Sequence, residues 1–443
     1  MQALQSPSSE LFRRRRERFL EQLGDGVAVL PAAQEIYRSR DTEVPFRQDS
    51  DFYYLTGFGE PGAVAVFSPH DPEHRFTLFV RPRDPERENW SGPRAGVEGA
   101  RDLFGADAAY ALPELDGRLK GLLEPADRIW YALGRGGPLD RHVVDLLTGF
   151  RRSRPRTGRG PWGLDDPGRV LGRMRMIKDE HEIGCIRRAA EITGAGHRAA
   201  MRAGHAGIGE WEIEAALHFS FRSAGATGPA YPSIVASGAN ARVLHYTANN
   251  RRAGDNDLVL LDAGAEYAMY CADITRTWPI SGRFSGAQRA VYELVLAAEE
   301  AALAVVAPGT SVAGVHDAAV RTLTEGLVDL GLLNGDVAGL IESGAYKRFY
   351  LHQTSHWLGL DVHDVGAYRD ASGPVVLEPG MVLTVEPGLY IPDDDDIPEH
   401  FRGIAVRIED DALVTVEGRE ILTRGVPVAP EEVEALARTR EPE

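Results

Sequence analysis

The chain has 443 residues, which is too long for one ordinary hydrophobic core, so we expect two or three domains. Its composition, 43% hydrophobic and 26% charged, is typical of a soluble globular protein. The formal net charge of -17, from 66 acidic and 49 basic residues, argues against binding to nucleic acid or to an anionic membrane.

Cysteine content and hydropathy indicate a cytoplasmic protein. Cys185 and Cys271 are too few for a disulfide framework and fit a reducing compartment. The sequence has no run of eighteen apolar residues, so we expect no segment to cross a membrane. Four arginines at residues 13–16 have no apolar core after them, so we interpret them as the solvated face of a helix rather than an export signal.

Strands alternate with helices through the first third of the chain, which indicates an α/β domain. A helix is predicted over residues 9–23, because its apolar side chains recur at helical spacing and Gly24 follows as a cap. Further along, the pattern predicts helices at 112–123 and 141–150 and strands at 27–30, 62–67, 76–80 and 128–131.

The segment 151–172 is basic and rich in proline and glycine, so we predict a domain boundary there. The two predicted domains are residues 1–172 and 173–443. Long amphipathic helices follow, and an α+β domain with helices packed on a mainly antiparallel sheet is expected. These helices are predicted at 179–201, 210–223, 286–306 and 312–330.

The stretch 259–278 places two aspartates at the ends of apolar strands. Asp262 ends one apolar run, Ala263 and Gly264 break it, and a second run returns through Asp273. A carboxylate in that position costs free energy unless a cation or hydrogen bonds satisfy it. The two acids could face each other and bind a hard cation, although an aspartate at a strand end also commonly starts a turn.

The stretch 383–388 repeats the pattern of residues 259–264. In both, an apolar strand ends in an acid and a glycine follows two residues later. Each is followed by a return strand with a second acid, Asp273 in the first case and Glu409 in the second. Two similar halves would bring four carboxylates together around a pseudo-two-fold axis, although such short echoes also arise by chance.

A group of four acids and one histidine is the predicted metal centre: Asp262, Asp273, His356, Glu386 and Glu409. Four carboxylates carry a charge of about -4, which two divalent cations would balance. Oxygen-rich ligation with one imidazole suits Mn, Co or Zn better than Ca. Two such ions can share a hydroxide that is nucleophilic at neutral pH.

Three histidines fall within residues 351–363, namely His352, His356 and His363. A lone histidine is usually a satisfied core or surface group, but three in one apolar segment indicate a functional cluster. His245 is a fourth candidate, and by itself it is a weak one.

The ordered set of motifs identifies a resemblance. The chain is similar to bacterial Xaa-Pro aminopeptidases, also called aminopeptidase P, of the pita-bread metallopeptidase family. The resemblance covers nearly the whole chain, and its motifs in order are RQDSDFYYLTGFGEP, LHYT, LLDAG, ADITRTWP, SHWLGLDVHDVG, TVEPGLYI and RIEDD. It implies an α/β N-terminal domain and an α+β pita-bread catalytic domain.

The resemblance also implies the ligands of two divalent metal ions, most consistent with Mn, with Zn or Co as alternatives. Asp262 should bind one ion, and Asp273 and Glu409 should bridge the two. His356 and Glu386 should complete the second ion's shell. Glu386 is in addition the expected acceptor of the proton from the attacking water.

Further site residues follow from the same resemblance. His245, His352 and His363 are expected to bind substrate and to stabilise the reacting carbonyl. Arg407 lies two residues before Glu409, so on a strand it shares that residue's face and could steady the carboxylates.

Two aromatic residues complete the predicted site. Tyr390 is expected at the substrate, and Trp90 resembles an aromatic that closes the active site of a neighbouring subunit. A homodimer or homotetramer is therefore expected, with the N-terminal domain contributing to oligomerisation and closure. The resemblance assigns no role to Cys271.

The predicted substrates are peptides with proline in the second position, cleaved before that proline. An Xaa-Pro dipeptidase (prolidase) shares the fold, ligands and metal and remains an alternative. A creatinase-like enzyme without metal would lack the ligands, and all five are present here. A non-enzymatic binding module on the same fold is the remaining alternative.

Overall fold

A computed structural model describes residues 9–135 and 137–439 of the chain. The chain divides into two compact units, Met1–Met174 and Arg175–Glu443. Helix α7 (Gly168–Met176) crosses both this division and the position predicted from the sequence, after residue 172. No helix among the described residues is long and apolar enough to cross a membrane.

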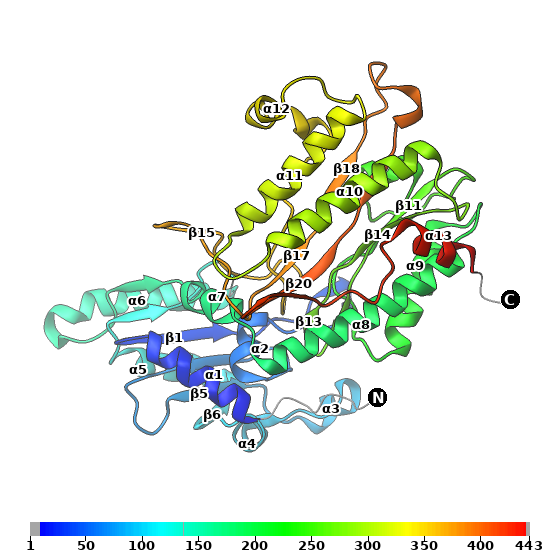
Figure 1. Ribbon diagram of the computed structural model, residues 1–443. Helices are drawn as coiled ribbons and strands as arrows, with labels where there is room; N and C mark the ends of the chain where they lie inside the picture. The colour runs from blue at the N-terminus through cyan, green and yellow to red at the C-terminus, as the bar shows by residue number, and fades with distance from the viewer. Residues whose placement is uncertain (1–8, 136, 440–443) are drawn as a thin grey trace. The chain divides into compact units, whose positions relative to one another are not determined.

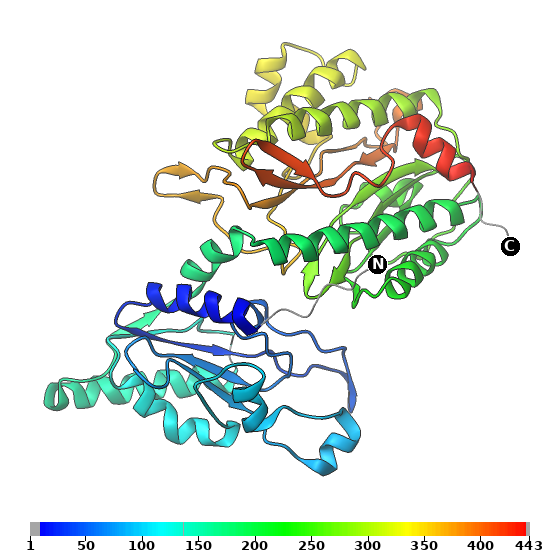
Figure 2. The same cartoon turned by 60° about the horizontal axis from the view of Figure 1, so that its bottom comes forward.

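The first unit is built on a six-stranded mixed sheet in the order β6-β5-β4-β1-β7-β8. Valines on one face of the sheet pack against leucines of α5 and Phe150 of α6, while Phe67 on the other face meets Phe19 of α1. The sheet therefore lies between two helical layers, as Figure 2 shows. The strands are β1 (Gly26–Pro31), β4 (Val64–Phe67), β5 (Phe76–Val80), β6 (Ala108–Ala111), β7 (Arg128–Trp130) and β8 (Gly163–Asp165).

The helices of the first unit begin with α1 (Ser9–Gln22), and a hairpin of β2 (Tyr37–Ser39) and β3 (Thr42–Glu43) follows β1. The others are α2 (Ser50–Thr56), α3 (Pro85–Ser91), α4 (Gly96–Asp102), the short 3-10 turn η1 (Leu112–Glu114), α5 (Leu115–Leu123) and α6 (Pro138–Thr157).

The interpretation of residues 13–16 as a solvated face is wrong for two of the four arginines. Arg15 and Arg16 are buried, at 2% and 5% exposure. The Arg16 guanidinium donates to the Leu55 carbonyl at 3.1 Å and lies 4.4 Å from the ring centre of Phe76. These partners come from elsewhere in the unit, so the local pattern could not reveal them.

The basic stretch 151–172, where a domain boundary is predicted, is mostly regular structure. Its first residues continue α6, its middle forms the edge strand β8, and its end begins α7. Pro155 lies in the last turn of α6, and Gly158 ends the helix three residues later in the left-handed conformation. Arg154 covers the ring of Trp162 at 3.9 Å, so the basic residues there also pack.

The second unit holds antiparallel strands between two pairs of helices (Figure 1). The pair α8 (Glu180–Ala203) and α9 (Glu210–Ser223) covers one side, and α10 (Gly286–Val305) and α11 (Val312–Asp329) cover the other. The side chain of Asp179 caps α8 by accepting from the Glu182 amide, which is why that helix begins where it does. The remaining helices are α12 (Val337–Ser343), α13 (Pro430–Arg438), η2 (Gly238–Arg242), η3 (Ala345–Arg348) and η4 (Glu399–Phe401).

The two echoed stretches form corresponding hairpins. β11 (Leu258–Asp262) pairs antiparallel with β14 (Thr275–Pro279), and β17 (Val382–Val385) pairs antiparallel with β20 (Asp410–Thr415). A bridge between Thr275 and Glu409 joins the two hairpins, with the Glu409 amide donating to the Thr275 carbonyl at 3.1 Å. The smaller strands are β9 (Gly228–Pro229), β10 (Ile234–Ser237), β12 (Ala265–Tyr267), β13 (Tyr270–Cys271), β15 (Arg369–Asp370), β16 (Gly373–Pro374), β18 (Gly388–Tyr390), β19 (Ala405–Arg407) and β21 (Gly418–Ile421).

Candidate active site

The acids of the sequence motifs meet where the two hairpins join. Asp262 is the last residue of β11, Asp273 precedes β14, Glu386 follows β17, and Glu409 precedes β20. They line a cavity of about 440 Å³ together with residues from the histidine-rich segment. The other lining residues are Tyr231, Pro232, Ile234, Leu244, His245, Thr247, His352, Gln353, Ser355, His356, Val362, His363 and Arg407.

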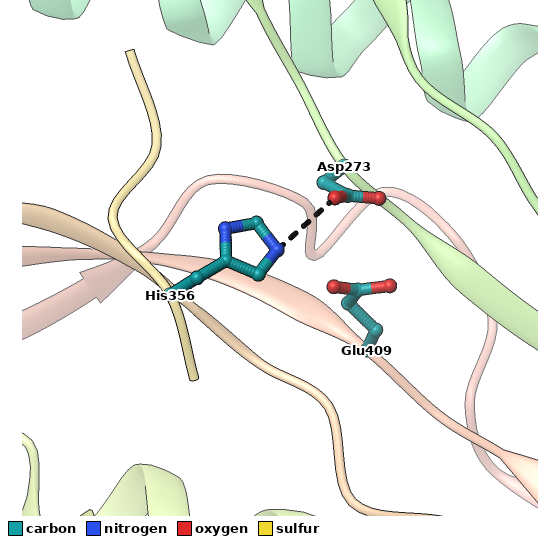
Figure 3. A group of neighbouring side chains, drawn as sticks. All are labelled: Asp273, His356 and Glu409. Atoms are coloured by element: carbon teal, nitrogen blue, oxygen red, sulfur yellow. Dashed lines mark ion pairs between the residues drawn. The ribbon is translucent and has the colours of Figure 1, made fainter. Parts of the chain in front are cut away.

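Asp273, His356 and Glu409 form the core of the candidate metal centre. One ligand atom from each lies within 4.8 Å of the others. Figure 3 shows the three side chains pointing toward one another from three separate segments. The His356 Nε2 atom is 3.4 Å from Asp273 Oδ2 and 3.6 Å from Glu386 Oε1, so the imidazole faces two carboxylates.

Burial of the acids shows why a cation fits here. Burial, followed by the charge of Asp273, holds the pKa of Glu409 well above its usual range. Burial likewise raises the pKa of Glu386 to about 8, although His356 and Arg407 act in the opposite direction. Carboxylates desolvated to this degree are costly when ionised, and divalent cations would supply the missing charge.

His356 has the orientation of a metal ligand. Its Nδ1 atom lies 3.0 Å from the Trp357 carbonyl and donates to it, which leaves Nε2 to face the acids. Burial opposes the charged form, but the hydrogen bond to Asp273 and the charge of Glu386 raise the pKa of His356 to about 9. In the absence of a metal ion, a proton on Nε2 thus takes the place of the cation.

Tyr231 is a site residue that the sequence analysis missed. Its hydroxyl contacts Asp262 Oδ1 at 2.7 Å and also Asp273 Oδ1, so it bridges two predicted ligands. Burial, followed by the charges of those two acids, raises the pKa of Tyr231 well above its usual range, so the hydroxyl remains a donor. Its partners are distant in sequence, and no local pattern at residue 231 points to them.

Arg407 connects the acids to the aromatic side of the site. It donates from Nη2 to Asp262 Oδ2 at 2.5 Å and from Nη1 to the Tyr390 hydroxyl at 2.8 Å. The same hydroxyl lies 2.9 Å from His352 Nε2. Tyr390, predicted at the substrate, is 3% exposed and is not among the residues that line the cavity.

The three predicted outer histidines all line the cavity. His352 Nδ1 lies 3.7 Å from Glu386 Oε2, and burial followed by the charge of Arg407 lowers the pKa of His352 to about 3. The ring of His363 meets that of His356 edge-on with centres 4.5 Å apart. Partial burial and the neighbouring His356 also lower the pKa of His363. His245 contributes to the cavity wall.

Trp90 and Cys271 are not among the residues that line the cavity. Trp90 belongs to α3 in the first unit and is 93% exposed. Cys271 is 1% exposed in the second unit. Its amide donates to the Gly359 carbonyl at 2.8 Å and its Sγ lies 3.5 Å from the Leu360 carbonyl, so it packs against the histidine-bearing segment.

The fold and the site together define a metalloenzyme with a carboxylate-rich centre between two antiparallel hairpins. Comparison with known families gives the class a name. The chain belongs to metallopeptidase family M24, which matches residues 184–416, and residues 12–130 match the aminopeptidase P N-terminal domain.

Full-length relatives agree with this assignment. The chain is 46% identical to the Xaa-Pro aminopeptidase of Escherichia coli K12, over 97% of this chain and 98% of that protein. It is 36% identical to human Xaa-Pro aminopeptidase 3, over 93% of this chain and 81% of that protein.

Solved structures give the same result. The structure of Pseudomonas aeruginosa aminopeptidase PepP has a TM-score of 0.94 and 47% identity, over 97% of this chain and 98% of that one. An alanine variant of Escherichia coli aminopeptidase P in complex with substrate has a TM-score of 0.93 and 44% identity, over 98% of this chain and 100% of that one. The predictions of the family, of the α/β N-terminal domain and of the pita-bread catalytic domain are therefore confirmed.

Proposed function

We propose that this enzyme removes the N-terminal residue from peptides whose second residue is proline. The observation that carries the proposal is the cavity in which the five predicted ligands and the three outer histidines converge. Relatives that match the chain over nearly its full length are Xaa-Pro aminopeptidases, and this supports that activity over the dipeptidase alternative.

Two divalent ions are proposed to occupy the centre, held by Asp262, Asp273, His356, Glu386 and Glu409. Manganese is proposed first, with zinc or cobalt as alternatives, because the donor set combines carboxylates with one imidazole. A zinc-substituted structure of Escherichia coli aminopeptidase P in complex with product indicates that a related site accepts such an ion. When bound, the ions supply a nucleophilic hydroxide at neutral pH and polarise the scissile carbonyl.

The protein's own groups would then handle protons and orientation. Glu386 Oε2, which lies 3.7 Å from His352 Nδ1, is proposed to accept the proton of the attacking water. Arg407 holds Asp262 in place through its short contact. His245 and His363, on the cavity wall, are proposed to bind the substrate carbonyl.

The preference for proline follows from the bond that is cleaved. The nitrogen of an Xaa-Pro bond carries no hydrogen, so enzymes that need this N–H as a donor cannot use it. A site that acts on the carbonyl does not need that hydrogen. The departing proline nitrogen must still gain a proton, and we propose Glu386 or His363 as its source.

Hydrolysis of matched peptides tests the proposal. We expect cleavage of Ala-Pro-Ala to release alanine, whereas Ala-Ala-Ala should be left intact. Activity confined to the dipeptide Ala-Pro would favour the dipeptidase instead. Metal analysis of purified protein, with Asp273→Ala as control, separates both from a binding module: metal-free protein that this change leaves unaffected would contradict the enzyme assignment.

Assembly and location are further parts of the proposal. We propose a homodimer or homotetramer in the cytoplasm, in which the first unit contributes to assembly and to closure of the active site. The support is the aminopeptidase P N-terminal domain in residues 12–130 and the exposed Trp90. Light scattering of the purified enzyme measures the assembly directly, and a monomeric mass would overturn this part.

A further inference from the structure

The segment that carries His363 contains a buried carboxylate to which the reaction described above gives no role. Asp364 follows His363 directly, and its side chain is only 1% exposed, whereas His363 itself is exposed. A buried ionised carboxylate is retained only when cations and hydrogen bonds compensate its desolvation.

The compensation comes from two cations close together in the chain, Arg175 near the end of α7 and Lys178 between α7 and α8. Arg175 donates from Nη2 to Asp364 Oδ1 at 2.5 Å and to Asp361 Oδ2 at 2.8 Å. Lys178 donates from Nζ to Asp364 Oδ2 at 3.1 Å. Both cations are almost wholly buried, at 2% and 4% exposure. The ion cluster therefore fastens the histidine-bearing segment to residues 175–178.

Packing around the cluster leaves little room for the segment to move. A methyl group added at Gly359 would collide with the Asp364 carboxylate and lie 3.0 Å from Lys178 Cε. At Gly366, whose φ is 143°, a methyl group would lie 2.5 Å from Met176 Cγ. The Asp364 amide donates to the Trp357 carbonyl at 2.9 Å, which closes the segment into a compact loop.

The place of the His363 ring depends on this loop. Within the described part of the chain, the His363 ring packs edge-on against the ring of His356, and this contact is not a hydrogen bond. The backbone on its C-terminal side, by contrast, is fixed by the two ion pairs of Asp364. A loop that shifted by about 1 Å would move the imidazole relative to the cavity, which is enough to slow a reaction that needs it.

We propose that Asp364, held by Arg175 and Lys178, is a positioning residue that sets the loop so that His363 faces the cavity. Its effect on turnover rests on the proposed function, in which His363 binds substrate. The placement of the ring is a property of the folded chain and can be measured without substrate.

The first test is the kinetics of Asp364→Asn, which keeps the side-chain shape and removes the charge. We expect kcat to fall about tenfold, with metal content unchanged. Asp257→Asn is the matched control, because it removes an ion pair with Arg251 in the same unit from a position outside the cavity lining. The control should lower thermal stability while kcat stays within about twofold of the unsubstituted enzyme.

A double-mutant cycle with His363→Ala separates positioning from a general structural role. If Asp364 acts through His363, Asp364→Asn should not slow the His363→Ala enzyme any further. Equal slowing in both backgrounds would overturn the proposal, and so would loss of metal from Asp364→Asn. Should that variant fail to fold, Lys178→Met keeps the Arg175 ion pair and should give the same pattern with a smaller fall.

Nuclear magnetic resonance of the metal-free protein gives a readout that does not depend on activity. His363→Ala assigns the His363 ring resonance, and Asp364→Asn should shift or broaden it while leaving that of His70, which belongs to the first unit, unchanged. An unchanged His363 resonance overturns the proposal. If the unsubstituted enzyme cleaves no Xaa-Pro peptide, the proposed function fails, while this spectrum still decides whether Asp364 positions the ring.

Discussion

At the scale of single residues, the cost of burying charged side chains governs the properties of the site. Asp262 is paired with Arg407, and His356 takes a proton between Asp273 and Glu386. Burial raises the pKa values of Asp273 and Glu386, so their ionised forms need compensating positive charge, which metal cations would supply. Ligands and outer histidines should therefore respond differently to substitution.

Removal of a ligand tests this distinction. We expect His356→Ala or Glu409→Ala to abolish activity, because the centre loses a metal ion. His352→Ala should retain its metal and turn over more slowly, because that side chain contacts Glu386 and Tyr390 from outside the ligand set. Metal content by mass spectrometry and kcat are measured together. A loss of metal from His352→Ala would place that histidine among the ligands.

A second residue-scale prediction concerns pH and His197. This side chain is fully buried, with Nε2 3.0 Å from the Ala263 carbonyl, and burial lowers its pKa from 6.5 to about 4. Below pH 6.5 the His197 imidazole binds a proton in the unfolded chain but not in the folded chain. The free energy of unfolding is therefore highest above pH 6.5 and falls as the pH drops toward 4. The difference of about 2.5 pKa units corresponds to about 3 kcal/mol.

Chemical denaturation of the metal-free protein at pH 7 and pH 4.5 measures this loss. His197→Gln, which keeps a donor near the Ala263 carbonyl, should lose less free energy of unfolding than the unsubstituted protein over the same range. Equal losses in the two proteins would show that His197 isn't the titrating group.

At the scale of elements, a tight return between β11 and β14 places Asp262 and Asp273. The amide of Ala263, next to Asp262, donates to the Ile274 carbonyl at 3.1 Å, so β11 and the chain before β14 stay in register around the site. Gly264 permits this close approach, because a methyl group there would collide with the backbone carbonyl of Ala272. Asp262 and Asp273 are both within two residues of that contact.

Gly264→Ala should therefore displace both acids. We expect the free energy of unfolding to fall by about 1–3 kcal/mol from overpacking, together with weaker metal binding. Gly286→Ala is the control, since no atom lies within 4 Å of the added methyl group at the start of α10. That change should leave metal binding intact and stability equal or higher. Metal titration and denaturation of both variants check the prediction, and unaltered metal affinity in Gly264→Ala would contradict it.

At the scale of the whole molecule, the two units carry different parts of the proposed function. The candidate metal centre and the histidines belong to the second unit, while the exposed Trp90 belongs to the first. A tryptophan at 93% exposure loses its contact with water only when another surface covers it. We proposed above that this surface is the active site of a neighbouring subunit.

Mixing two inactive or weakened variants tests this proposal. Trp90→Ala should lower activity without changing metal content, and His356→Ala should be inactive with its tryptophan intact. When the two are mixed and allowed to exchange subunits, we expect more activity than the sum of the separate preparations. Additive activity in a mixture shown to contain hybrid oligomers would contradict action between subunits.

Local sequence patterns indicated the candidate ligands but not the helix end and the edge strand within residues 151–172. Asp262 and Glu386 lie at the ends of apolar strands, and the structure brings Asp273, His356 and Glu409 within reach of one ion. Composition alone does not reveal those two elements, because a helix end and an edge strand can also be rich in proline, glycine and arginine. Tyr231 was missed because its partners lie 31 and 42 residues away in the chain.

The sequence by itself determined the family, the order of the strands that end in acids, and the types of side chain available to a metal, since these depend on residue identity and short spacing. Only the tertiary structure decided that Arg15 and Arg16 are buried, that Tyr231 bridges two acids, and that Asp364 meets Arg175 and Lys178. The physical reason is that burial and ion pairing depend on which distant segments pack together, and no local pattern in the chain encodes those contacts.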